Sequence, residues 1–227
     1  SLQRRYQKMI EEAPSPALND RMRAQIYDAA LSIIQHIGYL NAGTVEFILD
    51  QDQDKFYFLE MNTRIQVEHP ITEMITGLDI VKEQITIGAG QPLSVTQKEV
   101  SRNGHAIECR INAELPEADF RPCPGQIAHW NPPNMKDVRV DSHCYTGYFV
   151  PPYYDSLLAK LCAKGDDRPQ AIELMEDALA HFDVSGVDTT IPLYVSIMKN
   201  PEYRDGKINT RWVEHFLQGE LEKNEED

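Results

Sequence analysis

The chain has 227 residues, of which 41% are hydrophobic and 26% charged, as expected of a soluble globular protein with one or two domains. Its formal net charge of −14 argues against nucleic acid or an anionic membrane surface as a main partner. No stretch is long and apolar enough to span a membrane, no signal peptide is recognisable, and the four cysteines are not closely paired. We therefore expect a cytoplasmic protein.

The first predicted element is a helix. It follows a basic segment, residues 1–12, and runs from about Asn19 or Asp20, a good N-cap, to Ile37, just before Gly38. Apolar residues recur along it at helical spacing and predict one buried face. These residues are Met22, Ile26, Ala29, Ala30 and Ile33.

A β-hairpin is predicted next, from the β-rich runs 44–49 and 56–61 and the polar loop between them. If pairing is symmetric about Gln53, Glu46 lies opposite Glu60, about 5 Å away. Two carboxylates at that distance repel by about 3 kcal/mol at an effective dielectric constant of about 20. A divalent cation such as magnesium would offset this repulsion. The alternative is a slipped register, which would leave a solvated hairpin with the acids apart.

Residues 60–69 begin at the end of the hairpin, and the even positions from 60 to 68 are all polar. Carboxylates, amides and a guanidinium can together bind a metal and an oxyanion. In a straight strand, Glu60 and Glu68 would lie roughly 26 Å apart. We therefore expect the strand to end near Met61, with a curled loop holding the later residues near the metal, or else two separate sites. The polar residues are Glu60, Asn62, Arg64, Gln66 and Glu68.

The remaining elements divide at a change of composition after Gln91. We predict a boundary near residue 98, with domains 1–98 and 99–227. Short helices are expected over 71–76 and 79–87. Beyond the boundary the sequence predicts strands over 104–114 and 157–163, a turn-rich region over 121–151, helices over 168–182, 191–199 and 210–217, and an acidic end over 220–227 that is a frayed helix or a solvated tail.

Six runs lie in order along nearly the whole chain: residues 3–8, 43–47, 60–70, 105–114, 120–125 and 151–156. Together they closely resemble biotin carboxylase. The resemblance covers only the carboxyl-terminal half of such an enzyme. It implies an α+β fold: the carboxyl-terminal lobe of an ATP-grasp fold, an antiparallel sheet with helices, followed by a biotin carboxylase C-terminal domain of small antiparallel sheet plus helices.

The resemblance also implies a two-step reaction. ATP phosphorylates bicarbonate to carboxyphosphate, and the carboxyl group then passes to biotin on a carrier protein. The implied cofactors are ATP, magnesium or manganese, and biotin held on a separate domain or subunit. The implied partners are the biotin carboxyl carrier protein, a carboxyltransferase component and a second copy of the chain. We favour acetyl-CoA carboxylase, in fatty acid synthesis; pyruvate, propionyl-CoA and urea carboxylases share these motifs.

Site residues follow from the motifs by the same resemblance. The implied magnesium ligands are Glu46, Glu60 and Asn62, which agrees with the pairing of the two acids. Glu68 resembles the base that deprotonates bicarbonate. The bicarbonate cradle would be formed by Lys8, Arg64, Gln66 and the backbone of Val67. Arg110 resembles the group that binds the ureido oxygen of biotin. The nucleotide-binding set would be Gln3, Tyr6, Glu46, Ile48 and Glu60. The catalytic set would be Lys8, Arg64, Glu68 and Arg110.

The chain also departs from the family pattern. Tyr6 stands where the family usually has histidine, and Pro133-Asn134-Met135 replaces the usual Pro-Gly-Gly turn. No glycine-rich phosphate loop occurs among the 12 glycines. We therefore expect a fragment that is not a competent carboxylase by itself.

Three other interpretations stay open. The chain could be a non-catalytic dimerisation or scaffolding module, or part of another ATP-grasp ligase of the carbamoyl-phosphate or peptide type. Arg64, Glu68 and Arg110 could instead form a structural salt-bridge network, and Lys8 could be a solvated helix charge.

Overall fold

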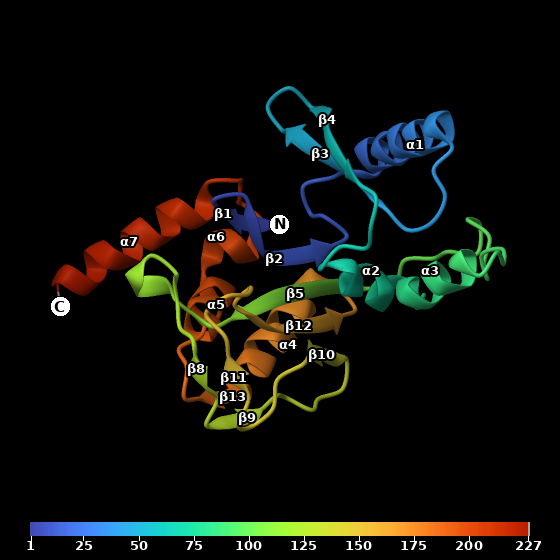
Figure 1. The fold of residues 1–227 in the computed structure, drawn as a ribbon. Helices are drawn as coiled ribbons and strands as arrows, with labels where there is room; N and C mark the ends of the chain where they lie inside the picture. The colour runs from blue at the N-terminus through green and yellow to red at the C-terminus, as the bar shows by residue number, and fades with distance from the viewer. Residues whose placement is uncertain (227) are drawn as a thin grey trace. The chain divides into compact units, whose positions relative to one another are not determined.

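The computed structural model describes residues 1–226 and divides into two compact units. One unit is Ser15–Arg102; the other joins Ser1–Pro14 to Asn103–Asp227 (Figure 1). The first 14 residues thus pack with the second half of the chain, because their strands extend its sheet. The division into homologous domains at residues 98 and 99 stays a prediction.

The unit that contains both chain ends is built on one five-stranded sheet. Every neighbouring pair of strands in this sheet is antiparallel. In spatial order the strands are β1 (Leu2–Arg4), β2 (Gln7–Ala13), β5 (His105–Asn112), β12 (Leu157–Gly165) and β10 (Val138–Ser142).

Helix α4 (Arg168–Ala180) covers one face of this sheet and packs on β12 and β5. Ile107 and Leu161 of the strands and Met175 of the helix are fully buried there, and burying each such side chain contributes about 1.5–3 kcal/mol. The chain passes from β12 to α4 through Gly165, where a Cβ would lie 2.4 Å from a backbone nitrogen of the helix. Only glycine permits this close approach.

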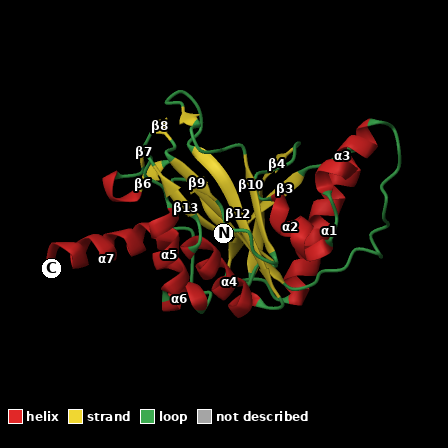
Figure 2. Ribbon diagram, turned by 90° about the horizontal axis from the view of Figure 1, so that it is seen from below, coloured by secondary structure: helices red, strands yellow, loops and turns green. Residues whose placement is uncertain are grey.

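The other elements of the unit surround this core. Figure 2 shows α4, α5 and α6 gathered beside the sheet. Short two-stranded ribbons fill the turn-rich region predicted over 121–151. The helices are α5 (Ile191–Lys199), α6 (Pro201–Arg204), α7 (Trp212–Glu226) and the 3-10 turn Pro116–Ala118. The ribbons pair β6 (Glu114–Leu115) with β7 (Arg121–Pro122), β8 (Gly125–Gln126) with β11 (Phe149–Val150), and β9 (His129–Asn131) with β13 (Asp183–Ser185).

Most of the elements predicted in this half are present. The strand expected over 157–163 continues to Gly165, and the helix expected over 191–199 has those bounds. The helix expected over 210–217 is α7, which continues to Glu226 and takes in most of the acidic end; Asp227 lies outside the described residues. Within residues 1–226, no helix is both long and apolar enough to cross a membrane.

The unit Ser15–Arg102 begins with α1 (Asp20–Ile37), whose predicted ends are confirmed. The Asn19 side chain caps it by accepting a hydrogen bond from the backbone N–H of Met22 (2.8 Å). Gly38 ends it in the left-handed conformation, with a φ of 64°. The predicted buried face is partly wrong: of its five residues only Met22 is buried, and the others are half-buried.

The rest of this unit is a hairpin followed by two helices. The hairpin is β3 (Thr44–Asp50) with β4 (Lys55–Asn62), and the helices are α2 (His69–Thr76) and α3 (Ile80–Gly88). Helix α2 begins two residues earlier than predicted, because a proline is tolerated in the first turn of a helix, where its missing N–H has no partner to lose. An ion pair between Arg21 and Asp54 joins α1 to the hairpin turn.

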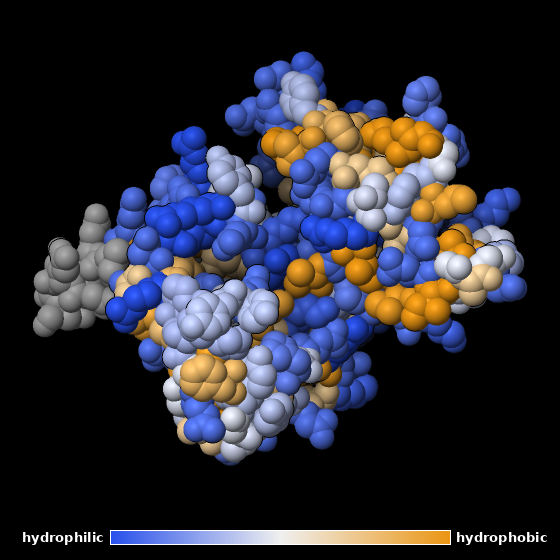
Figure 3. Space-filling view, viewed as in Figure 1, coloured by the Kyte–Doolittle hydropathy of each residue, from blue (hydrophilic) through white to orange (hydrophobic). Residues whose placement is uncertain are grey.

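Large apolar side chains stay exposed on this unit. Figure 3 shows orange, hydrophobic surface over the hairpin and α1. A hairpin of two strands cannot cover its own faces. Residues of this kind are Tyr27, Leu31, Ile37, Ile48, Tyr57, Phe58 and Leu59.

Candidate functional site

A pair of acids lies on the hairpin. Near the turn the strands pair Phe47 with Phe58, but one step further Glu46 pairs with Glu60, so Leu59 is left over as a bulge. A bulge re-aims the side chains beside it and is common next to functional sites. The prediction that Glu46 lies opposite Glu60 is therefore confirmed.

Two amides converge on these acids. The Nδ2 of Asn62 donates hydrogen bonds to Oε1 of Glu46 (3.1 Å) and Oε1 of Glu60 (2.9 Å). The Nε2 of Gln66 donates to the same Glu46 oxygen (2.6 Å). Gln66 is only 8% exposed, and its own Oε1 is buried without a hydrogen-bond partner. The amide N–H groups here offset the negative charge of two carboxylates.

This donor set fits a magnesium ion. Carboxylate and amide oxygens are the hard ligands that magnesium takes, and it usually accepts only one or two carboxylates from the protein. Within residues 1–226 no group of three or more His, Cys, Asp or Glu side chains is placed to hold a metal. Glu46 and Glu60 offer two carboxylates for an ion, and Asn62, whose Nδ2 faces both acids, would add a ligand by turning its amide oxygen toward it. Water or phosphate oxygens would complete the shell.

The loop after the hairpin curls, but it brings only part of the predicted segment to the acids. Strand β4 ends at Asn62, and the backbone carbonyl of Gln66 accepts from the N–H (3.3 Å) of His69 and lies 2.8 Å from its Nδ1. Val67 and Glu68 are half-buried in this turn. Arg64 is exposed, and its guanidinium donates to the carbonyl of Ile65 (3.1 Å), its neighbour in the chain, rather than to a carboxylate. The structure thus places Gln66 with the acids and leaves Arg64 outside that group.

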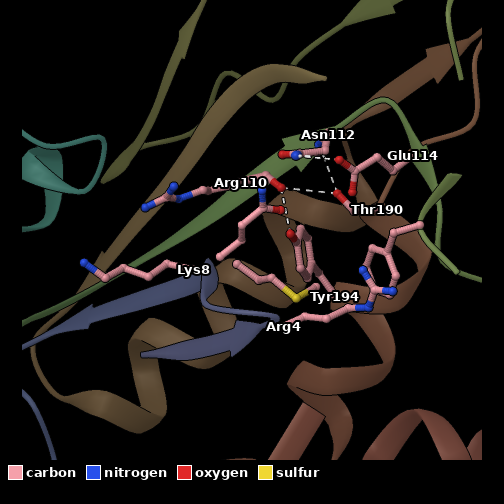
Figure 4. A pocket seen from close by; sticks show the side chains of 10 residues that line it. Arg4, Lys8, Arg110, Asn112, Glu114, Thr190 and Tyr194 are labelled. Atoms are coloured by element: carbon pink, nitrogen blue, oxygen red, sulfur yellow. Dashed lines mark hydrogen bonds between the residues drawn. The ribbon is translucent and has the colours of Figure 1, made fainter. Parts of the chain in front are cut away.

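A second group of predicted residues lies on the five-stranded sheet. Lys8 on β2 and Arg110 on β5 line one cavity of about 80 Å³. Figure 4 shows both side chains extending in the same direction, so two cationic groups are presented together. The other lining residues are Arg4, Gln7, Met9, Asn112, Glu114, Phe120, Thr190 and Tyr194.

Arg110 is fixed at both its backbone and its side chain. Its carbonyl accepts hydrogen bonds from the hydroxyls of Tyr194 (2.7 Å) and Thr190 (3.2 Å), as Figure 4 shows. Burial raises the pKa of Tyr194 well above its usual value, so its hydroxyl stays protonated and donates. The Nε of Arg110 donates to Oε1 of Glu11 (2.7 Å), and its Nη2 donates to the same oxygen. The guanidinium therefore has a fixed orientation.

The other predicted nucleotide-binding residues are more exposed. Gln3 lies on β1 directly opposite Lys8. Tyr6 is 93% exposed in the turn between β1 and β2, and Ile48 is exposed on β3. Their roles stay predictions.

Several residues of the second group were not singled out by sequence. Glu11, Thr190 and Tyr194 come from segments up to 183 positions apart (194 − 11), and no local pattern joins them. Only their shared contact with Arg110, inside a recognised motif, reveals them.

Two family models match the chain, one after the other. Residues 1–96 match the carbamoyl-phosphate synthase L chain ATP-binding domain, and residues 108–215 match the biotin carboxylase C-terminal domain. An ATP-binding domain of this type, with the acid pair on its hairpin, is typical of an ATP-dependent ligase.

Known proteins narrow the class to one family. The chain is 50% identical over 216 residues to biotin carboxylase 1 of Bacillus subtilis, covering 95% of this chain and 48% of that protein. The chain belongs to the biotin carboxylase family, and it spans about half the length of the curated relatives that it matches.

Solved structures of biotin-dependent carboxylases are also similar to this chain. The biotin carboxylase domain dimer of Hydrogenobacter thermophilus 2-oxoglutarate carboxylase, in complex with MgADP, ADP and bicarbonate, matches with a TM-score of 0.92 at 48% identity, over 95% of this chain and 47% of that one. A complete multifunctional pyruvate carboxylase from Rhizobium etli matches with a TM-score of 0.90 at 39% identity, over 93% and 22%. The predicted α+β fold and the resemblance to biotin carboxylase are thereby confirmed.

Proposed function

We propose that the chain supplies the metal-binding, bicarbonate-binding and biotin-binding part of a biotin carboxylase. Such an enzyme uses ATP and bicarbonate to carboxylate biotin on a carrier protein through carboxyphosphate. The observation that carries the proposal is the convergence of Glu46, Glu60 and Asn62. The amide N–H groups of Asn62 and Gln66 are neutral, so they leave the net charge of the two carboxylates in place, and a bound cation would neutralise it.

The hairpin residues would hold the metal, and the loop would hold bicarbonate. When bound, magnesium would offset the charge of the ATP phosphates. Arg64 offers a fork of donors that matches a planar oxyanion, and Lys8 a compact positive charge. Gln66 and the backbone of Val67 would add hydrogen bonds. Glu68 would accept the proton of bicarbonate, which prepares an oxygen to attack the terminal phosphate.

Arg110 would act on biotin. A ureido nitrogen becomes nucleophilic when it loses its proton and the negative charge moves to the ureido oxygen. A guanidinium aimed at that oxygen stabilises the charge as it develops. The fixed position of Arg110 between Glu11 and Tyr194 supports this role, because a preorganised donor needs no reordering during the reaction.

The wider assembly is also a proposal. We propose acetyl-CoA carboxylase, in fatty acid synthesis, as its setting, with the biotin carboxyl carrier protein and a carboxyltransferase component as partners. A solved relative is described as a dimer, which supports a homodimer here. The relatives include a multifunctional pyruvate carboxylase and a domain of a 2-oxoglutarate carboxylase, so the final acyl acceptor is set by the transferase component rather than by these motifs.

A chimera tests the catalytic proposal. The first half of Bacillus subtilis biotin carboxylase 1 is joined to this chain, and release of ADP is measured with and without bicarbonate and free biotin. We expect release that needs both, none from this chain alone, and a loss of about a hundredfold or more in Arg64→Ala and Glu68→Gln. Arg211→Ala, an exposed arginine directly before α7, is the matched control and should retain activity.

One outcome would refute the proposal, and another would refute only the expected inactivity of the isolated chain. A folded chimera without biotin-dependent activity would favour the non-catalytic dimerisation module, which analytical ultracentrifugation of the chain would then reveal. Bicarbonate-dependent ATP hydrolysis by the isolated chain would refute the expectation that it is incomplete. Mixing the two separately purified pieces repeats the test without the junction.

A further inference from the structure

Two buried acids to which the family resemblance assigns no role lie on the same two strands as Lys8 and Arg110. Glu11 on β2 and Glu108 on β5 are directly opposite each other, and they are 1% and 0% exposed. Side chains at such positions lie about 5 Å apart. In a buried site, two carboxylates that close cannot both keep their charge at low cost.

Glu108 is the member that stays neutral. Burial first, and then the charge of Glu11, raises the pKa of Glu108 to about 8. Three groups lower the pKa of Glu108: Lys160 and Cys162 on β12, and Arg110 on the same strand as Glu108. Their combined effect is smaller than that of burial and of the charge on Glu11. The Cys162 thiol donates a weak hydrogen bond (3.5 Å) to Oε2 of Glu108.

Glu11 is the member that carries the charge. One of its oxygens accepts two N–H groups of Arg110, along the edge formed by Nε and Nη2. Charge-assisted hydrogen bonds of this kind are about twice as strong as neutral ones. They use two of the five guanidinium donors and fix the rotation of the group about its stem. Arg110 is 19% exposed, so part of its side chain stays accessible to a ligand while Glu11 holds the Nε and Nη2 edge.

We propose that Glu11 is a positioning residue for Arg110, and that Glu108 supports it by remaining uncharged, so that the pair holds one negative charge that orients the guanidinium. The inference rests on the proposed function insofar as Arg110 is the group that meets biotin. The consequence is pre-ordering, because an arginine that is free in solvent loses rotamer entropy when it binds a ligand and one that is already held does not.

A matched control separates positioning from simple stabilisation. Glu12 is the next residue on β2, is also buried, and has its own ion pairs with His105 and Arg168. Its side chain points to the opposite face of the sheet, because successive residues of a strand alternate. Glu12→Gln therefore removes a comparable buried charge without touching Arg110.

The first experiment follows the guanidinium in the chain itself. The Nε–H resonance of Arg110 is recorded by nitrogen-15 NMR and assigned by its loss in Arg110→Lys. We expect a single resonance protected from exchange in the unmodified chain, in Glu12→Gln and in Glu108→Gln, and an averaged, fast-exchanging one in Glu11→Gln. Protection that persists in Glu11→Gln would overturn the inference. Should Glu11→Gln not fold, Glu11→Asp, which withdraws the carboxylate by one methylene, should loosen the same resonance.

The second experiment uses the active chimera. We expect Glu11→Gln to raise the KM for biotin about tenfold, because it removes a charge-assisted hydrogen bond, and Glu12→Gln to leave it unchanged. We expect the KM of the unmodified chimera to rise above pH 8, where a charged Glu108 would compete with Glu11 for the guanidinium of Arg110. Glu108→Gln copies the neutral acid and does not titrate, so it should keep the KM at pH 7 and lack this rise. An unchanged KM in Glu11→Gln refutes the inference alone. A chimera inactive in every form, with the NMR result intact, refutes the proposed function alone.

Discussion

Glu12 and His105 lie on the neighbouring strands β2 and β5, with Oε2 of Glu12 2.8 Å from Nε2 of His105. Arg168, the first residue of α4, donates from Nε to the same oxygen (2.7 Å) and from its other nitrogens to the carbonyls of Tyr203 (2.8 Å) and Arg204 (2.6 Å). One buried carboxylate thus connects the first strands of the chain to the helices near its end. The contact adds to the strand pairing that joins residues 1–14 to the unit containing β5 and α4.

Removing this carboxylate should destabilise the chain. We expect Glu12→Gln to lower the free energy of unfolding by about 3 kcal/mol, because breaking a buried pair leaves Arg168 with an uncompensated charge. Urea unfolding followed by circular dichroism measures the loss. The exposed Glu117→Gln is the control and should change little. Equal stabilities of Glu12→Gln and the unmodified chain would show that the buried pair contributes nothing.

The same pair predicts an acid-sensitive step. Burial would raise the pKa of Glu12, but the hydrogen bonds and charges of His105 and Arg168 outweigh it and lower the pKa below its ordinary value of 4.5. The pair therefore stabilises the fold fully above pH 4.5, and the stability is lost as the pH falls through the lower folded value. The difference in unfolding free energy between the unmodified chain and Glu12→Gln should shrink below pH 4.5. A difference that is constant down to pH 3 would contradict this.

Glu108 predicts the opposite dependence of stability on pH. Because its pKa is raised from 4.5 to about 8, the folded chain binds a proton there that the unfolded chain has released. Stability conferred by the neutral acid should therefore fall as the pH rises from 4.5 to 8, by about 1.4 kcal/mol per unit and on the order of 4 kcal/mol in all. Glu108→Gln does not titrate. We measure the free energy of unfolding of both chains in urea at pH 5, 6.5 and 8. The stability of Glu108→Gln relative to the unmodified chain should increase with pH. A difference that does not change with pH would show that Glu108 is ionised in the folded chain.

The acid pair on the hairpin predicts a metal effect. Adding magnesium should raise the Tm of the unmodified chain, since a ligand that binds only the folded state stabilises it. Glu60→Gln should lose this rise, and without magnesium it should be about 1 kcal/mol more stable, because it removes a like charge opposite Glu46. Asp52→Asn, in the turn of the same hairpin, is the control and should keep the rise. The same magnesium response in all three chains would exclude Glu60 as a ligand.

The sequence predicted the hairpin well and the first strands not at all. Glu46 and Glu60 could be paired because their strands alternate and their loop is short, so the register depends on local signals. Strand β2 gave no such signal. It lies inside the sheet, and Met9, Ile10, Glu11 and Glu12 are all buried, so apolar and polar positions do not alternate.

The site shows the same difference between local and distant contacts. Glu46, Glu60, Asn62 and Gln66 lie within 20 positions of each other, and their convergence could be expected from one hairpin and its loop. The contact of Glu11 with Arg110 joins residues 99 positions apart. It depends on the order of strands in the sheet, which no single segment encodes, and buried acids at such positions have no distinctive sequence pattern.

The turn between β1 and β2 carries strain that can be tested. Its two residues, Arg5 and Tyr6, have φ values of 48° and 67°, the left-handed pair of a hairpin turn that Asn-Gly normally fills. A non-glycine residue there costs on the order of 1 kcal/mol. Tyr6→Gly should therefore raise the free energy of unfolding by about 1 kcal/mol, since Tyr6 is 93% exposed. Tyr153→Gly, at an exposed tyrosine whose φ is not positive, is the control and should not stabilise.

A contact with the nucleotide would give this strained turn a function. Strain of this kind clusters at ligand sites, where it presents a side chain outward. If Tyr6 contacts the nucleotide as the family resemblance implies, Tyr6→Gly in the chimera should raise the KM for ATP several-fold while the chain itself becomes more stable. An increase in stability with an unchanged KM would leave the strain without a functional role and would remove Tyr6 from the nucleotide-binding set.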